Sequence, residues 1–289
     1  MFNSVIDSVL SGGVNVIDAA INYRYMKSER TVGAALRHLI STKNIDRNEL
    51  FICSKGGYIP EDADQGIPGH TIIKNLIEKK LISEEDFVGA CHCMHPNYLE
   101  DQLQRSLDNM GLETLDLYYL QNAAETQLPL IGEAKFFERL AKSFEFLEKK
   151  ILEGKIKSYG LATWVCFREN AENTGIYLSL EKVLELANKV GGSSHGLKYI
   201  QMPINIMMPE AFAEVFQEIT ENGVKTKERM LTVARKLKVN IISCSPLLQG
   251  TMIQLPMPSE IFKCKNLGAK HLQFVRSIPA ESLLSIGFL

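Results

Sequence analysis

Short apolar runs alternate along the chain with longer segments in which apolar residues recur every three or four positions. The short runs, rich in β-branched residues, predict buried strands, and the longer segments predict amphipathic helices that cover them. The predicted strands are Val14–Asp18, Leu50–Lys55, Leu115–Leu120, Lys157–Ala162, Tyr199–Pro203, Val239–Ser245 and Leu283–Gly287. The predicted helices are Glu29–Ile40, Tyr98–Met110, Phe136–Leu152, Ser179–Val190, Lys227–Leu237 and Ala269–Ser277. This alternation is typical of an α/β protein with a parallel sheet.

Two long segments between the predicted elements lack a clear hydrophobic period. They are Gly56–Pro96, which contains several Gly and Pro residues, and Asn122–Glu133. We expect both to be long surface insertions, of the kind that shapes the substrate opening when it follows a strand of a barrel. No repeat, low-complexity tract or linker divides the chain, so we expect one domain over residues 1–289.

The composition is that of a globular protein with a sizeable core, since 45% of its 289 residues are hydrophobic and 23% are charged. A formal net charge of −2 provides no broad cationic field, which argues against a nucleic-acid partner. No run of about 18 apolar residues predicts a membrane span. The oligomeric state does not follow from the sequence.

The start of the chain and the cysteines bear on its location. The first residues have no positively charged region, and Asp7 interrupts their apolar stretch, so a secretory signal is not expected. The six cysteines show no paired framework, and Cys53 and Cys244 lie in predicted buried strands. This usage suits a reducing compartment, and we expect the cytoplasm, with an organelle as the alternative.

Histidine and cysteine motifs give weaker signals. Cys91, Cys93 and His95 would share one side of an extended segment and could offer three ligands to a soft metal. No second cluster completes such a site, so a loop leading into the helix Tyr98–Met110 is the preferred interpretation. His70 could reach a substrate opening, although an exposed loop histidine is the preferred interpretation. Neither GxGxxG nor GxxxxGK[ST] occurs, which disfavours Rossmann and P-loop enzymes.

Seven local sequences carry more specific information, and they occur in a fixed order over nearly the whole chain. They are Gly13–Tyr23 followed by Ser28-Glu29 and Val32–Leu36, then Phe51–Lys55, Leu115–Leu120, Gly154–Leu161, Tyr199–Pro203, Ser245–Gly250 and Gln273–Ser277. In this order they resemble the aldo-keto reductase family. The resemblance implies a (β/α)₈ TIM barrel, an NADP cofactor and reduction of a small-molecule carbonyl or aldehyde by hydride transfer.

The residues at the ends of the first two predicted strands suit this chemistry. Hydride transfer to a carbonyl leaves negative charge on its oxygen, so an acid must deliver a proton there. Tyr23 is the candidate acid. A free phenol has a pKa of about 10, and an ammonium held beside it by a carboxylate lowers that value; Lys55 and Asp18 would do this. The alternatives are a rim tyrosine and a structural Lys55–Asp18 ion pair.

The resemblance also implies cofactor contacts in the second half of the chain. Gln201 would hold the nicotinamide carboxamide, with a satisfied buried amide as the alternative. Thr163 stands where many members carry a Ser, and it retains a hydroxyl for a hydrogen bond. Ser245 and Leu247 belong to a cofactor-binding segment, and Arg276 would lie near the phosphate end of the cofactor.

The sequence departs from the family pattern in the catalytic region. Gln121 stands where the family usually has a His that is hydrogen-bonded to the substrate carbonyl. Its amide donates a hydrogen bond but cannot take up a proton or carry a positive charge, and one lost donor of this kind costs on the order of 3 kcal/mol. Cys244 stands where a Tyr often stacks on the nicotinamide ring, which predicts weaker cofactor binding.

The resemblance further implies that both ends of the barrel are absent from this sequence. The chain opens at a predicted helix, Ser4–Leu10, which in the family follows the first barrel strand. It ends right after the eighth barrel strand, without the family's cofactor loop and last helices. Together with Gln121 and Cys244, these features leave a second hypothesis open, a non-catalytic pseudoenzyme or regulatory subunit. Retention of Asp18, Tyr23 and Lys55 favours the enzyme.

Overall fold

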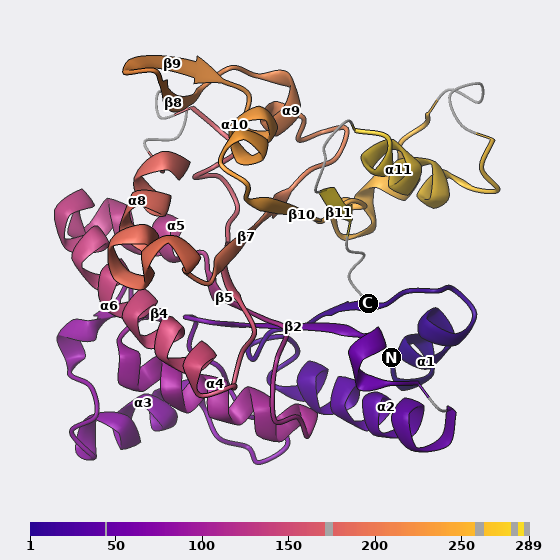
Figure 1. Ribbon diagram of the computed structural model, residues 1–289. Helices are drawn as coiled ribbons and strands as arrows, with labels where there is room; N and C mark the ends of the chain where they lie inside the picture. Colours follow the sequence, from indigo (N-terminus) through magenta and orange to yellow (C-terminus); the bar gives the residue numbers. More distant parts are fainter. Residues whose placement is uncertain (44, 171–175, 258–262, 279–282, 286–289) are drawn as a thin grey trace. The chain divides into compact units, whose positions relative to one another are not determined.

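The computed structural model describes residues 1–43, 45–170, 176–257, 263–278 and 283–285 (Figure 1). These residues group into two compact units, which are described separately. The first contains Met1–Gly160 and Ala187–Gly196, and the second contains Leu161–Leu186 and the described residues from Leu197 onward. The single domain expected over residues 1–289 stays a prediction.

The centre of the first unit is a group of three parallel strands, β1 (Val16–Asp18), β2 (Phe51–Gly56) and β5 (Leu117–Gln121) (Figure 1). Their side chains are buried or nearly so, as expected of strands covered on both faces. Asp18 pairs in register with Cys53, and Lys55 pairs with Tyr119. Because side chains alternate along a strand, this register places Asp18, Lys55 and Tyr119 on one face of the sheet.

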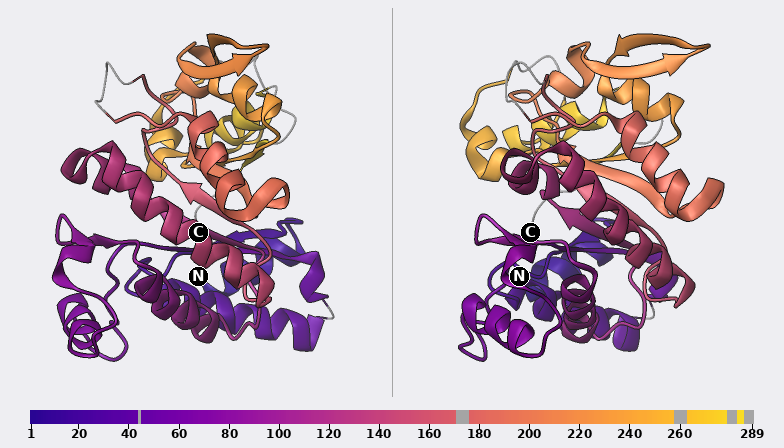
Figure 2. Two further views of the ribbon diagram at one scale, coloured as in Figure 1. Left: turned by 60° about the vertical axis from the view of Figure 1, so that its left-hand side comes forward. Right: turned by 90° about the vertical axis from the view of Figure 1, so that its left-hand side faces the viewer.

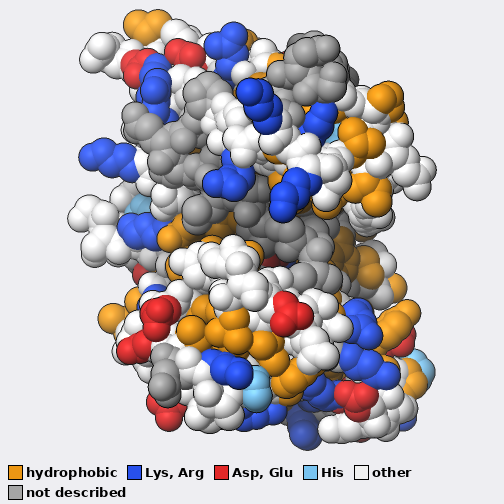
Figure 3. Space-filling view, turned by 90° about the vertical axis from the view of Figure 1, so that its right-hand side faces the viewer, with side chains coloured by type: hydrophobic (Ala, Val, Ile, Leu, Met, Phe, Trp, Pro, Cys, Tyr) orange, Lys and Arg blue, Asp and Glu red, His pale blue; other side chains and the backbone are white. Residues whose placement is uncertain are grey.

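Helices α1 (Phe2–Leu10), α2 (Lys27–Lys43), α4 (Pro96–Met110) and α6 (Glu133–Leu152) also belong to this unit, with the short turn η1 (Arg47–Glu49). In Figure 1, α2 and α4 run side by side below the strands. They approach so closely that a Cβ added to Gly33 would lie 2.6 Å from the backbone oxygen of Asn109. Apolar side chains reach the surface on the face that carries α1, where Phe2 and Leu10 are exposed (Figure 3).

The segment Gly56–Pro96 is more ordered than the sequence predicts. It contains α3 (Gly69–Glu78), η2 (Glu84–Asp86) and a hairpin of β3 (Phe87–Val88) and β4 (His92–Cys93). A separate hydrophobic cluster lies beneath it, formed by Ile21, Met26, Ile72, Leu76, Ile82, Cys93 and Tyr98. The expected loop over Asn122–Glu133 is also wrong, because helix α5 (Ala123–Ile131) occupies most of it.

The second unit has its own parallel strands, β7 (Leu197–Pro203), β10 (Asn240–Cys244) and β11 (Leu283–Ser285). Its further elements are α9 (Glu210–Ala213), α10 (Met230–Lys236), η4 (Leu248–Gln254) and α11 (Leu267–Arg276). Strand β6 (Tyr159–Ala162) and helix α8 (Leu180–Gly191) each contain residues of both units, and η3 (Gly192–Ser194) follows α8. All seven predicted strands are therefore confirmed, the last as far as Ser285.

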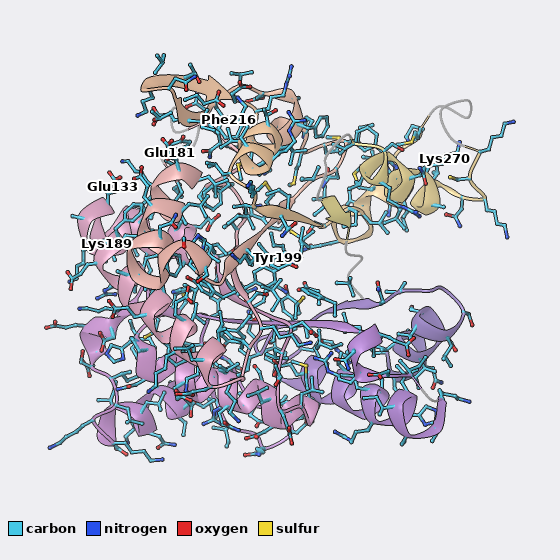
Figure 4. The ribbon with its side chains drawn as sticks, in the orientation of Figure 1. Glu133, Glu181, Lys189, Tyr199, Phe216 and Lys270 are labelled. Atoms are coloured by element: carbon cyan, nitrogen blue, oxygen red, sulfur yellow. The ribbon has the colours of Figure 1, made fainter. Side chains whose placement is uncertain are left out.

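A hairpin of β8 (Gln217–Glu221) and β9 (Val224–Glu228) precedes α10 and lies beside it in the second unit (Figure 2). Asn222 and Gly223 turn the chain with positive φ angles of 54° and 76°, as in the tightest hairpin turns. Glu181, labelled in Figure 4, accepts hydrogen bonds from the backbone and hydroxyl of Thr220 at 2.9 and 3.0 Å. The helix predicted to begin at Lys227 therefore begins at Met230, after the hairpin.

Among the described helices, none combines the length and the apolar character that a membrane crossing needs.

Candidate active site

Three of the predicted catalytic residues meet at the ends of β1 and β2. Lys55 Nζ donates to Asp18 Oδ2 at 2.6 Å and to the backbone oxygen of Ala19 at 2.9 Å. The side chains of Lys55 and Asp18 are each only 1% exposed. The same Nζ lies 4.8 Å from the centroid of the Tyr23 ring. The structure thus brings an ammonium, a carboxylate and a phenol together in the first unit.

The loop after β1 folds back over the end of β2 and so delivers Tyr23. The backbone N–H of Ala19 donates to Cys53, and that of Ile21 donates to Lys55, at 3.1 and 3.5 Å. The next residues, Arg24, Tyr25 and Met26, all have positive φ angles, between 50° and 68°. Consecutive non-glycine residues in this region are uncommon and cost free energy, which the surrounding contacts must offset. The sharp turn keeps Tyr23 close to the strand ends.

The electrostatics of this group favour a charged lysine. Burial by itself lowers the pKa of Lys55, but the Asp18 carboxylate and the Tyr23 phenolic group outweigh it, and the pKa of Lys55 is raised overall. Lys55 therefore carries its positive charge at neutral pH. A cation fixed in a buried position next to a phenol stabilises the phenolate form of that phenol.

Gln121 ends β5 and is held by a histidine that sequence reasoning did not place in the site. His92 Nε2 lies 2.8 Å from the backbone oxygen of Gln121, and Gln127 Nε2 lies 2.9 Å from His92 Nδ1. Burial lowers the pKa of His92 to about 4, although its bond to Gln121 raises it. The ring is therefore neutral, donating from Nε2 and accepting at Nδ1. The Oε1 atom of Gln121 is buried without a hydrogen-bond partner among the described residues.

The backbone at Gly57 passes so close to the His92 ring that only a residue without a side chain fits there. Gly57 has a φ of +127°, and a Cβ there would lie 2.4 Å from His92 Nε2. The Tyr58 ring packs edge-on against the imidazole, with centroids 5.4 Å apart. The only sequence signal in this segment was the Cys91–His95 motif, for which a loop leading into the helix Tyr98–Met110 was preferred over a metal site. Among the described residues, no group of three His, Cys, Asp or Glu could hold one.

Two of the predicted cofactor residues lie together in the second unit. The backbone N–H and the hydroxyl of Thr163 both donate to the backbone oxygen of Gln201, at 2.8 and 3.0 Å. Gln201 is 3% exposed, and its side-chain Nε2 is buried without a partner among the described residues. A buried amide donor of this kind is costly unless a ligand satisfies it. The alternative of a fully satisfied amide is therefore not favoured.

The remaining predicted cofactor residues lie on or near the segment after β10, also in the second unit. Ser245 is buried, and its backbone oxygen accepts from Asn205 Nδ2 at 3.0 Å. Leu247 is half-buried and precedes a turn with several positive φ angles. Arg276 lies exposed in the last turn of α11. The catalytic candidates belong to the first unit and the cofactor candidates to the second.

The sequence profile of the Aldo/keto reductase family matches residues 3–173 of the chain. This match covers more than half of the sequence, and the chain belongs to the aldo/keto reductase family. No curated protein matches the chain by sequence.

Solved structures of this family show the same fold. An aldo-keto reductase from Bacillus halodurans, in its holo form, aligns over 98% of this chain and 75% of its own, with a TM-score of 0.59 and 16% identity. An aldo/keto reductase from Klebsiella pneumoniae, in complex with NADP and acetate, aligns over 100% and 74%, with a TM-score of 0.60 and 16% identity. The aldose reductase from Schistosoma japonicum aligns over 98% and 73%, with a TM-score of 0.55 and 17% identity. The α/β barrel expected from the sequence is confirmed by these likenesses.

Proposed function

We propose that this protein is an NADP(H)-dependent oxidoreductase that reduces an aldehyde or ketone by hydride transfer. The observation that carries the proposal is the buried contact of Lys55 Nζ with Asp18 at 2.6 Å and with the Tyr23 ring at 4.8 Å. Membership of the aldo/keto reductase family supports an oxidoreductase. The neighbouring Klebsiella pneumoniae structure, which contains NADP, supports the choice of cofactor.

Tyr23 is the proposed proton donor. As negative charge develops on the substrate oxygen, the phenol gives up its proton, and the ammonium of Lys55 stabilises the phenolate that remains. Asp18 keeps Lys55 in place and compensates its charge in a buried environment. Gln121 is the proposed hydrogen-bond donor to the same oxygen, without the positive charge that a histidine in its place could carry.

The second unit offers groups that fit a nicotinamide. The buried Nε2 of Gln201, which has no partner among the described residues, suits the oxygen of the carboxamide. Thr163, Ser245 and Leu247 are proposed to complete this binding region, and Arg276 to meet a phosphate. The bound cofactor supplies the hydride. The six free cysteines suit a reducing compartment, so we propose the cytoplasm as the location.

Cofactor binding can be measured through the only tryptophan of the chain, Trp164, which follows Thr163 directly. Titration with NADPH should quench its fluorescence in a saturable manner, and adding an aromatic aldehyde to the complex should consume NADPH. The control is NADH at the same concentrations, which should bind less tightly. Consumption of NADPH at the same rate with and without the aldehyde would contradict the proposal.

The second candidate function is a non-catalytic, regulatory member of the family. Gln121 favours it, because the site lacks a protonatable group at the end of β5, and Cys244 favours it because a small thiol stands at a proposed nicotinamide contact. This candidate predicts either no NADPH binding at millimolar concentration or saturable binding without turnover of any carbonyl compound. Turnover that depends on Tyr23 would exclude it.

A further inference from the structure

The first unit contains a cavity of about 430 Å³ that none of the proposed catalytic residues lines. Its wall includes Asn22, Tyr25, Tyr58, Glu61, His70 and Cys91. These residues come from the loop after β1, the loop after β2, helix α3 and the β3–β4 hairpin. A cavity of this size accommodates a small organic molecule.

Residues that line this cavity are close in sequence to the proposed catalytic group. Asn22 directly precedes Tyr23, and Tyr58 follows Lys55 by only three positions. Asn122, which directly follows Gln121, donates from Nδ2 to the hydroxyl oxygen of Tyr58 at 3.3 Å. The wall thus contains residues that follow the carboxyl ends of β1 and β2, the ends where a parallel barrel holds its active site, and Asn122 after β5 is hydrogen-bonded to that wall.

Several contacts fix the walls in place. Arg30 of α2 forms two hydrogen bonds with the Asp62 carboxylate, at 2.7 and 2.6 Å, and a third with Asp64 at 2.7 Å. These bonds anchor the loop that carries Tyr58 and Glu61. The backbone N–H of Ile59 donates to Cys91 at 2.9 Å, which joins that loop to the hairpin. A rim held in this way is preorganised, and preorganisation reduces the entropic cost of binding.

The charge and aromatic character of the cavity favour a cation. Glu61 is the only Asp, Glu, Lys or Arg among the described residues that line it. The rings of Tyr25 and Tyr58 offer π faces, which attract an ammonium group. Burial raises the pKa of Tyr58, and the Glu125 carboxylate adds to this effect, although the bond from Asn122 opposes it. Tyr58 therefore remains an uncharged phenol beside a second acidic group.

Three cations on the neighbouring helices are paired with acids, whereas Arg24, which directly precedes Tyr25, donates to Met1 Sδ at 3.2 Å. Lys27 lies 3.6 Å from Asp64, and Arg30 is bound by Asp62 and Asp64. Lys74, on α3, lies 3.7 Å from Glu78. Glu61, which is exposed, is the carboxylate of the described cavity wall, and Glu125 acts electrostatically on Tyr58.

We infer that this cavity binds the part of the substrate remote from its carbonyl, and that it selects carbonyl compounds that carry an ammonium group over those that carry a carboxylate. The inference rests on the proposed function, because it assigns the substrate class of the same site. Glu61 is the residue that determines this specificity, and the two tyrosine rings support it.

The test compares three aldehydes with the same number of methylene groups. One ends in a trimethylammonium group, one in the uncharged tert-butyl isostere and one in a carboxylate. The wild type should prefer the cation to its isostere by about fivefold in kcat/KM, the size expected of a partly exposed ion pair with cation–π support. Glu61→Gln should lose most of this preference, and Glu61→Lys should favour the carboxylate. Raising the salt concentration should weaken the preference.

The matched control is Glu113→Lys, which makes the same change of net charge as Glu61→Lys at an exposed position that does not line the cavity. It should keep the wild-type preference. Equal kcat/KM for the cation and its isostere, or a preference that survives Glu61→Lys, would overturn the inference.

A second measurement separates this inference from the proposed function. If no aldehyde is reduced, the proposed function fails, and the cavity is tested by calorimetric titration with the trimethylammonium alcohol and the tert-butyl alcohol. If the trimethylammonium alcohol binds more tightly than the tert-butyl alcohol, and Glu61→Gln loses this difference, the cavity's preference for cations is supported independently of the proposed function. Equal binding, or no binding of either alcohol, would contradict it.

Discussion

Lys55 and Asp18 form an ion pair that is almost fully removed from water, and such pairs are sensitive to the loss of one partner. Lys55→Met leaves the Asp18 carboxylate buried without its cation, and we expect a loss of about 3–5 kcal/mol in the free energy of unfolding. Adding Asp18→Asn to this variant should recover most of the loss, because no buried charge remains. Urea unfolding of Lys55→Met, of Asp18→Asn and of the double variant gives the coupling free energy between the two charges. Strictly additive effects would show that the two charges do not interact.

Gln121 limits catalysis if the reaction needs a stronger hydrogen-bond donor at the substrate oxygen. Gln121→His should raise kcat by about a hundredfold, the value associated with one such donor. Gln104→His, on the exposed side of α4, makes the same exchange away from the site and should leave kcat unchanged. An unchanged kcat in Gln121→His would remove the role proposed for this position.

Single residues of the site were predictable where strand ends marked them. The resemblance to the aldo-keto reductases singled out Asp18, Tyr23 and Lys55, and because all three lie at or just after apolar runs, the parallel order of the strands implied that they meet. His92 was not predictable in this way. Its partners Gln121 and Gln127 are 29 and 35 positions away, and no hydrophobic period relates the three.

At the scale of elements, the contact between α2 and α4 depends on Gly33. An added Cβ would lie 2.6 Å from backbone atoms of Asn109 and Met110, which cannot move aside as a flexible side chain can. Gly33→Ala should therefore destabilise the protein by about 1–3 kcal/mol, although helix propensity alone would favour alanine by about 1 kcal/mol. Thermal or urea unfolding measures this, with the half-buried Ala34→Ser as control. A stabilised Gly33→Ala variant would contradict the close packing.

The β3–β4 hairpin, through His92, makes stability depend on pH. The pKa of His92 is lowered by burial from 6.5 to about 4, so the unfolded chain binds more protons than the folded one between these values. Stability is then fully present above pH 6.5 and is lost as the pH falls, by about 2 kcal/mol between pH 7.5 and pH 5. Wild type and His92→Gln should be unfolded in urea at both values. The variant should show a smaller loss than the wild type, and equal losses would contradict a buried neutral histidine.

The hydrophobic pattern predicted the long elements well and the short ones poorly. All seven strands and the helices α2, α4 and α6 follow from clear apolar runs or stripes. Strands of two residues, as in β3 and β4, are too short to show a period. Helix α5 contains Pro129, which argues against a helix in sequence, and in β9 four of the five residues are exposed and three are charged. These elements form because packing and turn geometry override local pattern.

At the scale of the whole molecule, the two sets of proposed site residues follow the division of the chain. Proton donation is assigned to the first unit and cofactor binding to the second. Membership of the aldo/keto reductase family and the shared barrel fold were accessible from the order of seven motifs that resemble those of the family. The substrate preference proposed for the cavity was not accessible, because most of the cavity wall lies in Gly56–Pro96, which the sequence presented only as a surface insertion.

The central claim is that Tyr23 donates the proton for carbonyl reduction with NADPH. Tyr23→Phe removes one hydroxyl group and leaves the ring beside Lys55. It should lower kcat by about 10²–10⁴-fold, the range of general acid catalysis. NADPH should quench the fluorescence of Trp164 in this variant with the wild-type affinity. Wild-type turnover in Tyr23→Phe would contradict the account.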